Sequence, residues 1–195
     1  MDTWVIVAIV AAVVLAIVVV FAAWSYLRRR HSDDLRDTFG PEYDRVVRDQ
    51  GRGAGEKELE SRRERVKVFD VRPLSQEQYT AFTTRWTESQ ARFVDDPSAA
   101  IGDADALVEE VMQARGYPIE GDFERRAADI SVDHPELVSN YRSAYEVSKR
   151  HESGDATTEE LRRAMVNYRA LFADLLETGE GDARVPRAVE SEQRG

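Results

Sequence analysis

The chain contains no cysteine among its 195 residues, and it has only three histidines. Without cysteine there are no disulfide bonds, no metal sites with thiolate ligands and no cysteine nucleophile, and this composition agrees with a reducing cytoplasm. None of His31, His134 and His151 follows a glutamate by three residues, so the Glu-x-x-His pairs of a di-metal bundle are missing. We therefore predict no metal site and no cofactor.

The chain also lacks an excess of positive charge. It carries 27 Lys and Arg against 37 Asp and Glu, for a formal net charge of −10, and Asp2 is the only charged residue before Arg28. Non-specific binding to nucleic acid depends on attraction between basic side chains and phosphates, which an acidic domain does not supply. We therefore exclude nucleic acid as a main partner.

Catalytic motifs are missing as well. No Gly-x-Ser-x-Gly nucleophile elbow occurs. The glycine-rich residues 51–57 (GRGAGEK) are a poor match to a phosphate-binding loop, because no strand pattern precedes them and Glu56 separates glycine from lysine. The sequence favours a flexible linker there. The carboxylates Asp103, Asp105, Glu109 and Glu110 flank an apolar stripe, so we expect them on a solvated face and predict no catalytic residue.

The sequence does contain one long apolar run. Residues 4–27 are almost entirely Val, Ile, Ala, Leu and Phe, and roughly 20 such residues span a bilayer as a helix. Trp4 and Trp24 are twenty positions apart, which places one indole near each interface, and Tyr26 joins the second. The run predicts a membrane anchor at residues 1–30.

The charges beside the run predict its orientation. Three arginines, Arg28, Arg29 and Arg30, follow it directly, whereas no cation precedes it, which is the reverse of a cleavable signal peptide. Because Lys and Arg stay on the cytoplasmic side, we expect a single-pass protein of the cell membrane with its N-terminus outside and its C-terminal domain cytoplasmic. Three charges fall short of a dedicated site for anionic lipid, so we interpret them as a topology signal.

Small residues recur along the predicted anchor. Ala8, Ala12 and Ala16 share one helix face and would let two anchors approach closely. The run has no glycine, and alanine is common in membrane helices, so a monomeric anchor is favoured over a weak homodimer.

Residues 31–70 predict helices close to the membrane. A Gly40-Pro41 pair interrupts a helical apolar pattern, so we expect a kink and then a short helix over residues 41–50. After the linker, residues 56–68 are dense in charge and predict a solvated spacer helix.

Residues 71–178 predict an all-α bundle of about four longer helices and one short helix. Capping boxes begin two of the helices, at Ser75 with Gln78 and at Thr157 with Glu160. No segment alternates at period two. The expected core comprises helix-spaced apolar residues, namely Tyr79, Phe82, Trp86, Phe93, Ile101, Ala104, Leu107, Val108, Val111, Met112, Phe123, Ala127, Ile130, Leu137, Tyr141, Ala144, Tyr145, Leu161, Ala164, Met165, Tyr168, Phe172 and Leu175. Residues 179–195 are predicted to be disordered.

Four side chains of the bundle have two interpretations. Trp86, Tyr117, His134 and Tyr141 would pack in the core, or would line a pocket if the bundle binds a small molecule. For His134, between Asp133 and Pro135, capping or packing at a helix start is favoured over a role as ligand or base.

Six stretches together carry a resemblance. They are FGPEYDR at 39–45, VRPLS at 71–75, RFVDDP at 92–97, RGYP at 115–118, RAAD at 126–129 followed by DHP at 133–135, and YRALF at 168–172. On these residues the chain resembles an uncharacterised family of actinobacterial single-pass membrane proteins with a helical cytoplasmic domain. The resemblance implies a membrane-anchored helical domain and supplies no functional residue.

An anchor, a spacer and an acidic bundle favour a non-enzymatic interaction or scaffold module that binds a protein partner. The alternative is a small-molecule-binding or enzymatic bundle tethered to the membrane.

Overall fold

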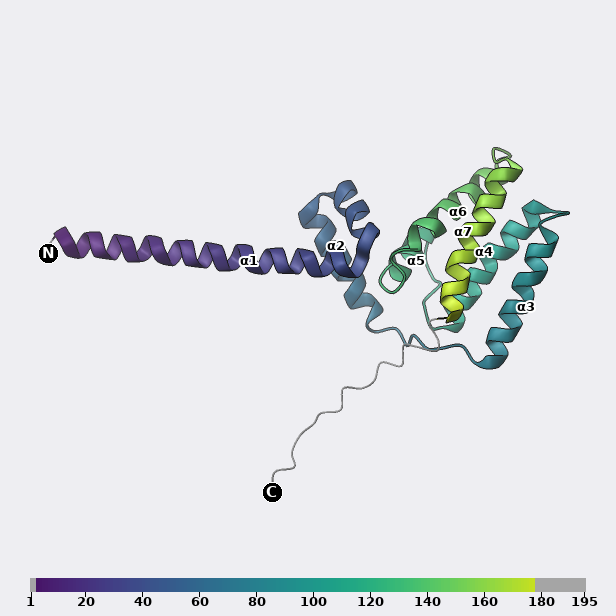
Figure 1. Ribbon diagram of the computed structural model, residues 1–195, viewed down its shortest axis with the longest axis horizontal. Helices are drawn as coiled ribbons and strands as arrows, with labels where there is room; N and C mark the ends of the chain where they lie inside the picture. The colour runs from purple at the N-terminus through teal and green to yellow at the C-terminus, as the bar shows by residue number, and fades with distance from the viewer. Residues whose placement is uncertain (1–2, 178–195) are drawn as a thin grey trace, which may run out of the picture. The chain divides into compact units, whose positions relative to one another are not determined.

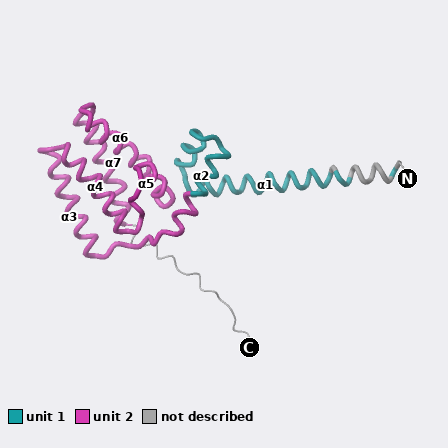
Figure 2. Tube along the Cα trace, turned by 180° about the vertical axis from the view of Figure 1, so that it is seen from behind, with its two compact units in different colours: residues 1–61 teal, residues 62–195 magenta. Residues whose placement is uncertain are grey.

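The computed structural model describes residues 3–177, with the side chains of residues 3, 5–11 and 14 left out of the description. Over this range the protein is all-α, with seven helices and no strand (Figure 1). The predicted tail at residues 179–195 lies outside the described residues. The chain divides into two compact units, residues 1–61 and residues 62–195 (Figure 2), and α2 crosses the boundary between them.

The first unit is built on α1, Thr3–Gln50, which contains the predicted kink. Gly40 has φ 45° and ψ −125°, a backbone conformation that glycine adopts without the penalty of a side chain. Pro41 then begins the second segment of the helix, where its missing N–H has no intrahelical acceptor. The break expected from the Gly40-Pro41 pair is confirmed.

The predicted flexible linker is wrong. Only Gly51, with φ 79°, separates α1 from α2, Arg52–Val66, so residues 52–55 are the first turn of a helix. A Cβ on Gly55 would lie 3.2 Å from the carbonyl oxygen of Val46 and from the Cα of Val47. Glycine is therefore needed at position 55 because two helices approach closely there, and its effect is packing and not flexibility.

The expectation of a fully solvated spacer helix is also wrong. α2 buries Glu56, Leu59, Arg62 and Val66 at helical spacing, and Leu59 is completely inaccessible. Two of these four residues are charged, so the buried face could not be recognised from hydrophobicity. Among the described residues of the first unit, the other buried large apolar side chains are Leu35, Phe39, Tyr43 and Val46 of α1.

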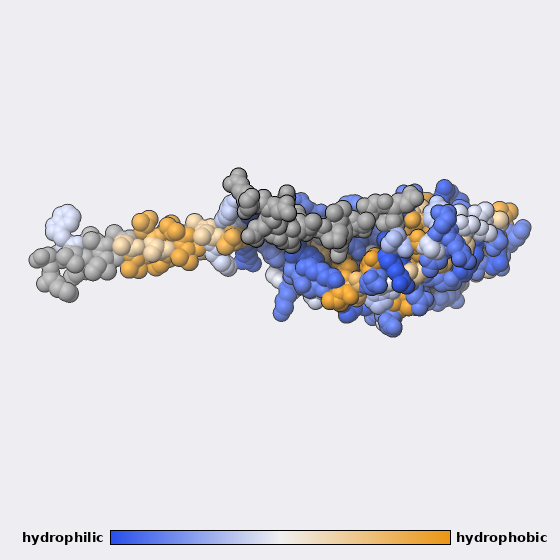
Figure 3. Space-filling model, turned by 90° about the horizontal axis from the view of Figure 1, so that it is seen from below, coloured by the Kyte–Doolittle hydropathy of each residue, from blue (hydrophilic) through white to orange (hydrophobic). Residues whose placement is uncertain are grey.

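The N-terminal half of α1 presents apolar side chains outward. Leu15, Ile17, Val20, Phe21 and Leu27 are each more than 60% exposed. In Figure 3 the coloured residues of this part of the helix are mainly hydrophobic. Among the described residues, no helix is sufficiently long and apolar to cross a membrane.

The second unit contains the predicted bundle. Its helices are α3 (Gln76–Arg92), α4 (Pro97–Ala114), α5 (Phe123–Ile130), α6 (Val138–Glu152) and α7 (Thr158–Glu177). α7 packs against α4 and α6, and α3 packs against α4, so the four longer helices lie side by side while α5 contacts α6 (Figure 1). The expectation of four longer helices and one short helix is confirmed.

The predicted caps are present. The Ser75 hydroxyl accepts a hydrogen bond from the Gln78 amide, and the Gln78 side chain accepts one from the Ser75 amide. Thr157 and Glu160 exchange the equivalent pair before α7. The hydrogen bond from the Thr157 amide to the Glu160 carboxylate, with further bonds from the Thr157 hydroxyl and Arg150, lowers the pKa of Glu160 to about 2. These reciprocal bonds satisfy amides that have no intrahelical acceptor.

Most of the predicted core is buried, including every core residue predicted for α4 and α7. The aromatic stripe of α3 is only partly correct. Phe82 and Trp86 are buried and Phe93 packs at the edge of the core, but Tyr79 is 41% exposed. Tyr79 lies in the first turn of α3, near the start of the helix.

Candidate functional site

The four candidate pocket residues of the bundle do not form one group. Tyr117 and His134 lie together, with ring centroids 6.4 Å apart, and the Tyr117 hydroxyl donates a 2.6 Å hydrogen bond to Oδ2 of Asp133. Trp86 instead stacks on Phe172, with ring centroids 4.5 Å apart, and Tyr141 contacts Phe123 at 4.8 Å. All four side chains are less than 7% exposed, so they contribute to packing.

His134 has one partnered and one unpartnered ring nitrogen. Nδ1 contacts the carboxylate of Asp174 on α7, and Nε2 is buried with no hydrogen-bond partner in the described part of the chain. Burial lowers the pKa of His134, while the Asp174 carboxylate opposes that shift. The His134 side chain thus connects the segment that follows α5 to α7.

A second polar group inside the bundle was missed by sequence reasoning. Asp105 of α4 lies near Tyr168 of α7, and the rings of Tyr168 and Tyr141 are 6.2 Å apart. The Asp105 Oδ1 atom and both tyrosine hydroxyls are buried, and the side chain of Tyr168 interacts with Asp105 while that of Tyr141 interacts with Arg126. Burial raises the pKa of Asp105 and of both tyrosines.

This arrangement corrects the expectation for the α4 carboxylates. Asp105 is half-buried and directed toward the core, and Glu109 pairs with Arg126 of α5, so neither belongs to a freely solvated face. Asp103 and Glu110 are paired with Arg92 and Arg85 of α3. Tyrosine hydroxyls at core positions were the available signal, since a buried hydroxyl normally requires a polar partner.

The first unit contains a buried polar cluster centred on Glu56. The Oε1 atom of Glu56 accepts hydrogen bonds from Ser32 at 2.6 Å, from Tyr43 at 2.9 Å and from Arg52 at 3.0 Å. Arg52 also donates to the Ser32 hydroxyl at 2.6 Å. Burial alone would raise the pKa of Glu56, but these donors hold it below its ordinary value. The cluster fixes the first turn of α2 against α1.

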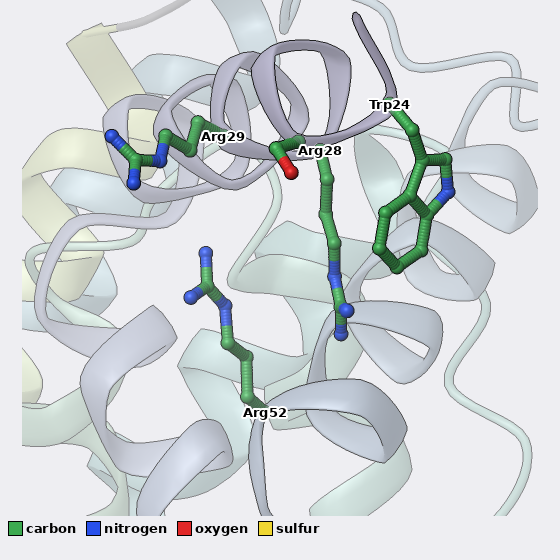
Figure 4. Close-up of a pocket in the computed structure, with 5 residues that line it drawn as sticks. Trp24, Arg28, Arg29 and Arg52 are labelled. Carbon is green, nitrogen blue, oxygen red and sulfur yellow. The ribbon is translucent and has the colours of Figure 1, made fainter. Parts of the chain in front are cut away.

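An arginine-lined pocket lies beside this cluster. It has a volume of about 280 Å³ and is lined by Trp24, Ser25, Arg28, Arg29 and Arg52. In Figure 4 the side chains of Arg28 and Arg52 extend from facing segments of α1 and α2, and the Trp24 ring lies beside Arg28. The Arg28 guanidinium carbon is 5.4 Å from the centroid of that ring. The arrangement can accept an anion with several oxygen atoms.

Sequence reasoning found part of this pocket. It assigned Trp24, Arg28 and Arg29 to the anchor and its topology signal, and it missed Arg52, which is 23 positions beyond Arg29 and reaches the pocket only because α2 turns back on α1. Arg30 does not line the pocket, and its guanidinium carbon lies 5.0 Å from the ring centroid of Tyr26. Trp4 is 85% exposed.

The alanine face lies in the same half of α1. Ala12 and Ala16 are exposed, and the side chain of Ala8 is outside the described residues. Among the described residues, no group of three or more His, Asp and Glu side chains is arranged as a metal site.

The comparisons with known proteins place the chain in no family. No protein-family model matches it, and neither a curated protein nor a solved structure matches it. The resemblance to actinobacterial single-pass membrane proteins therefore stays a prediction.

Proposed function

We propose that the protein is a membrane-anchored, non-enzymatic helical interaction or scaffold module. The observation that carries this proposal is the exposed apolar surface of α1, where Ile17, Val18, Val19, Val20 and Phe21 are all between 57% and 68% exposed. A contiguous apolar surface of this kind is costly in water and marks a contact with a membrane or another protein. With the sequence of residues 4–27, it favours insertion into a bilayer.

The proposed protein belongs to the cell membrane and crosses it once. Arg28, Arg29 and Arg30 directly follow the apolar segment, which supports an external N-terminus and a cytoplasmic bundle. Trp24 and Tyr26, each 55% exposed, would lie at the cytoplasmic interface and Trp4 at the external one.

In this proposal the bundle binds a cytoplasmic protein. Its surface offers paired charges of both signs, for example Arg85 with Glu110 and Arg92 with Asp103, across α3 and α4. Rim charges of this kind guide association and specificity more than affinity. The four candidate pocket side chains are packed in the core, which supports an interaction role.

The proposal is tested in two steps. The full-length protein with a reporter after Gly195 is first separated into membrane and soluble fractions. We expect it in the membrane fraction after an alkaline carbonate wash, with the reporter active only in the cytoplasm. Crosslinking in intact cells followed by purification should then recover one reproducible protein partner. Recovery in the soluble fraction, or an externally active reporter, would contradict the anchor or its orientation.

A second function is favoured by one observation. The buried side chains of Asp105, Tyr141 and Tyr168 form the kind of polar group that holds a small polar molecule in a bundle core. Replacing Tyr168 by Phe distinguishes the two functions. If the site is structural, Tyr168→Phe should change the melting temperature of the purified and of the refolded protein equally, because the contact that it removes lies within the chain. A decrease for protein purified from its native cells, absent in refolded protein, would favour a bound ligand.

Self-association of the anchor is a separate proposal. Ala8, Ala12 and Ala16 would form the contact of a weak homodimer. Crosslinking in the membrane should then depend on these alanines, and replacing Ala12 by Leu should abolish the dimer.

A further inference from the structure

The arginine-lined pocket of the first unit carries more positive charge than its neighbours neutralise. Arg28, Arg29 and Arg52 line one volume of about 280 Å³, and Glu56 is the single carboxylate bonded to any of them among the described residues. The guanidinium groups of Arg28 and Arg29 make no hydrogen bond or ion pair with residues 3–177, although Arg28 contacts the Trp24 ring. Like charges gathered in one pocket repel each other unless an anion joins them.

The pocket is also preorganised on one side. Arg52 donates through Nε to Glu56 and through Nη2 to Ser32, and both partners are less than 8% exposed. Its guanidinium is therefore held in place before a ligand binds. A fixed guanidinium plane suits an oxyanion such as phosphate, because two N–H groups can bind two oxygens.

The position of the pocket narrows the class of anion. Its wall continues the exposed apolar surface of α1, since Trp24 lines both this pocket and an apolar one with Ala16, Ile17, Val20 and Phe21. A ligand that fits both surfaces has a phosphate next to an acyl chain. A soluble phosphate would use the arginines alone.

We propose that the pocket lined by Arg28, Arg29 and Arg52 binds the phosphate headgroup of an acidic phospholipid, with Trp24 contacting the start of its acyl region. This site rests on the proposed membrane anchor. Arg28, Arg29 and Arg30 of α1 alone would act only as diffuse surface charge. Arg52 of α2 faces Arg28 and Arg29 across the pocket, so that the three side chains can surround a single headgroup.

The test uses the full-length protein in nanodiscs of phosphatidylcholine with a minor fraction of phosphatidylglycerol. Lipids that stay bound after release into detergent are counted by native mass spectrometry. The test variant is Arg28→Gln/Arg29→Gln, whose side chains bond to no described residue. The control is Arg30→Gln/Arg48→Gln, because it removes the same charge, Arg30 does not line the pocket and Arg48 is an exposed residue of the last turn of α1.

We expect the wild-type protein and the control to retain phosphatidylglycerol over phosphatidylcholine. In the test variant this preference should decrease by about tenfold or more. Equal decreases in the test and control variants would show diffuse attraction and overturn the site, as would equal retention of the two lipids by the wild-type protein.

Further outcomes distinguish a lipid headgroup from free phosphate, and the headgroup site from the membrane anchor. If millimolar inorganic phosphate displaces phosphatidylglycerol while the acyl chain adds no affinity, the ligand is free phosphate and the lipid assignment is overturned. Insertion into nanodiscs without preference for phosphatidylglycerol would overturn the headgroup site and leave the anchor intact. Failure to enter nanodiscs would overturn both.

Discussion

Single buried polar residues connect distant parts of this protein. Glu56 accepts three hydrogen bonds in the first unit. In the second unit, Asp129 is 2% exposed and pairs with Arg65 at 2.6 Å. His134 lies against Asp174 on α7. A buried polar group is costly without its partner, so replacing one member of such a group has a larger effect than replacing a surface charge.

The stability of the bundle should depend on the protonation of His134. Burial holds the pKa of folded His134 below that of an unfolded histidine, which is about 6.5. Just below pH 6.5 the unfolded state therefore binds the proton more tightly. The contribution of His134 is complete above that pH and decreases as pH falls toward the lower folded pKa, by at most about 1.4 kcal/mol per pH unit.

The substitution His134→Gln tests this dependence, because glutamine can donate to Asp174 and does not titrate. We expect the free energy of unfolding of the wild-type protein, measured with urea, to decrease more between pH 7 and pH 5 than that of the variant. The control is His31→Gln, since His31 is exposed on α1. If His134→Gln and the wild-type protein give parallel pH profiles, proton binding at His134 does not control stability.

Gly116 is required both by its backbone and by its surroundings. It has φ +95°, and a Cβ there would lie 2.2 Å from the carbonyl oxygen of Asp70. The neighbouring Arg115 carbonyl accepts a hydrogen bond from the Arg72 amide, so this contact holds residues 70–72 against the end of α4. Gly116→Ala should lower the free energy of unfolding by about 2–5 kcal/mol, from left-handed strain and overpacking together.

The matched control for Gly116 is Gly154→Ala. Gly154 has φ +80° but no neighbour within 4 Å of the added Cβ, so only the backbone strain of about 1–2 kcal/mol applies. Urea denaturation of both variants separates the two contributions. Equal losses would show that residues 70–72 move aside at no cost.

At the scale of helices, the Glu56 cluster determines how α2 begins. In Glu56→Ala the Ser32, Tyr43 and Arg52 donors lose their shared acceptor, and the contact of α2 with α1 should weaken by about 1–3 kcal/mol. Hydrogen exchange should become faster for amides of the first turn of α2 and should not change in α4 and α7. Glu64→Ala is the control, because Glu64 of α2 forms an exposed pair with Lys67, which follows the helix. Unchanged exchange near residue 52 in Glu56→Ala would show that packing of Leu59 and Gly55 is sufficient.

The bundle helices were predictable because their signals are local. Ser75 with Gln78, and Thr157 with Glu160, mark two starts within four residues, and the apolar stripe of α4 repeats at period 3.6. α2 could not be predicted in the same way. Its buried face includes Glu56 and Arg62, and its glycines indicate a linker unless the nearby backbone of Val46 is known.

The candidate sites were predictable only where neighbours in space are also neighbours in sequence. Arg28 and Arg29 were identified as a group, but the contribution of Arg52 depends on the turn at Gly51. The same limit applies to Asp105 with Tyr168, which are on different helices. Charged residues were assigned to solvated faces because sequence hydrophobicity contains no information on which of them find a buried partner.

At the scale of the whole molecule, the two units imply where the chain can be divided. The sequence pattern predicts a bundle that begins at Val71, whereas the second compact unit begins at Arg62. Residues 62–70 include Arg65, which forms an ion pair with Asp129. Within the described chain, the only other cation near the Asp129 carboxylate is Arg125, at 3.8 Å. Removing Arg65 leaves a buried carboxylate with one weak partner, which is destabilising.

A fragment of residues 62–195 should therefore unfold with the midpoint that the bundle has in the full-length protein, because its core is formed within the second unit. A fragment of residues 71–195 should lose about 2 kcal/mol or more, measured by urea denaturation. Arg65→Gln in the longer fragment is the control that isolates the ion pair from the rest of the removed segment. If the Arg65→Gln fragment has the same urea midpoint as the fragment of residues 71–195, the Arg65–Asp129 pair accounts for the loss of stability. Equal midpoints for both wild-type fragments would instead show that the bundle is complete from Val71, and that residues 62–70 serve only to connect it to the first unit.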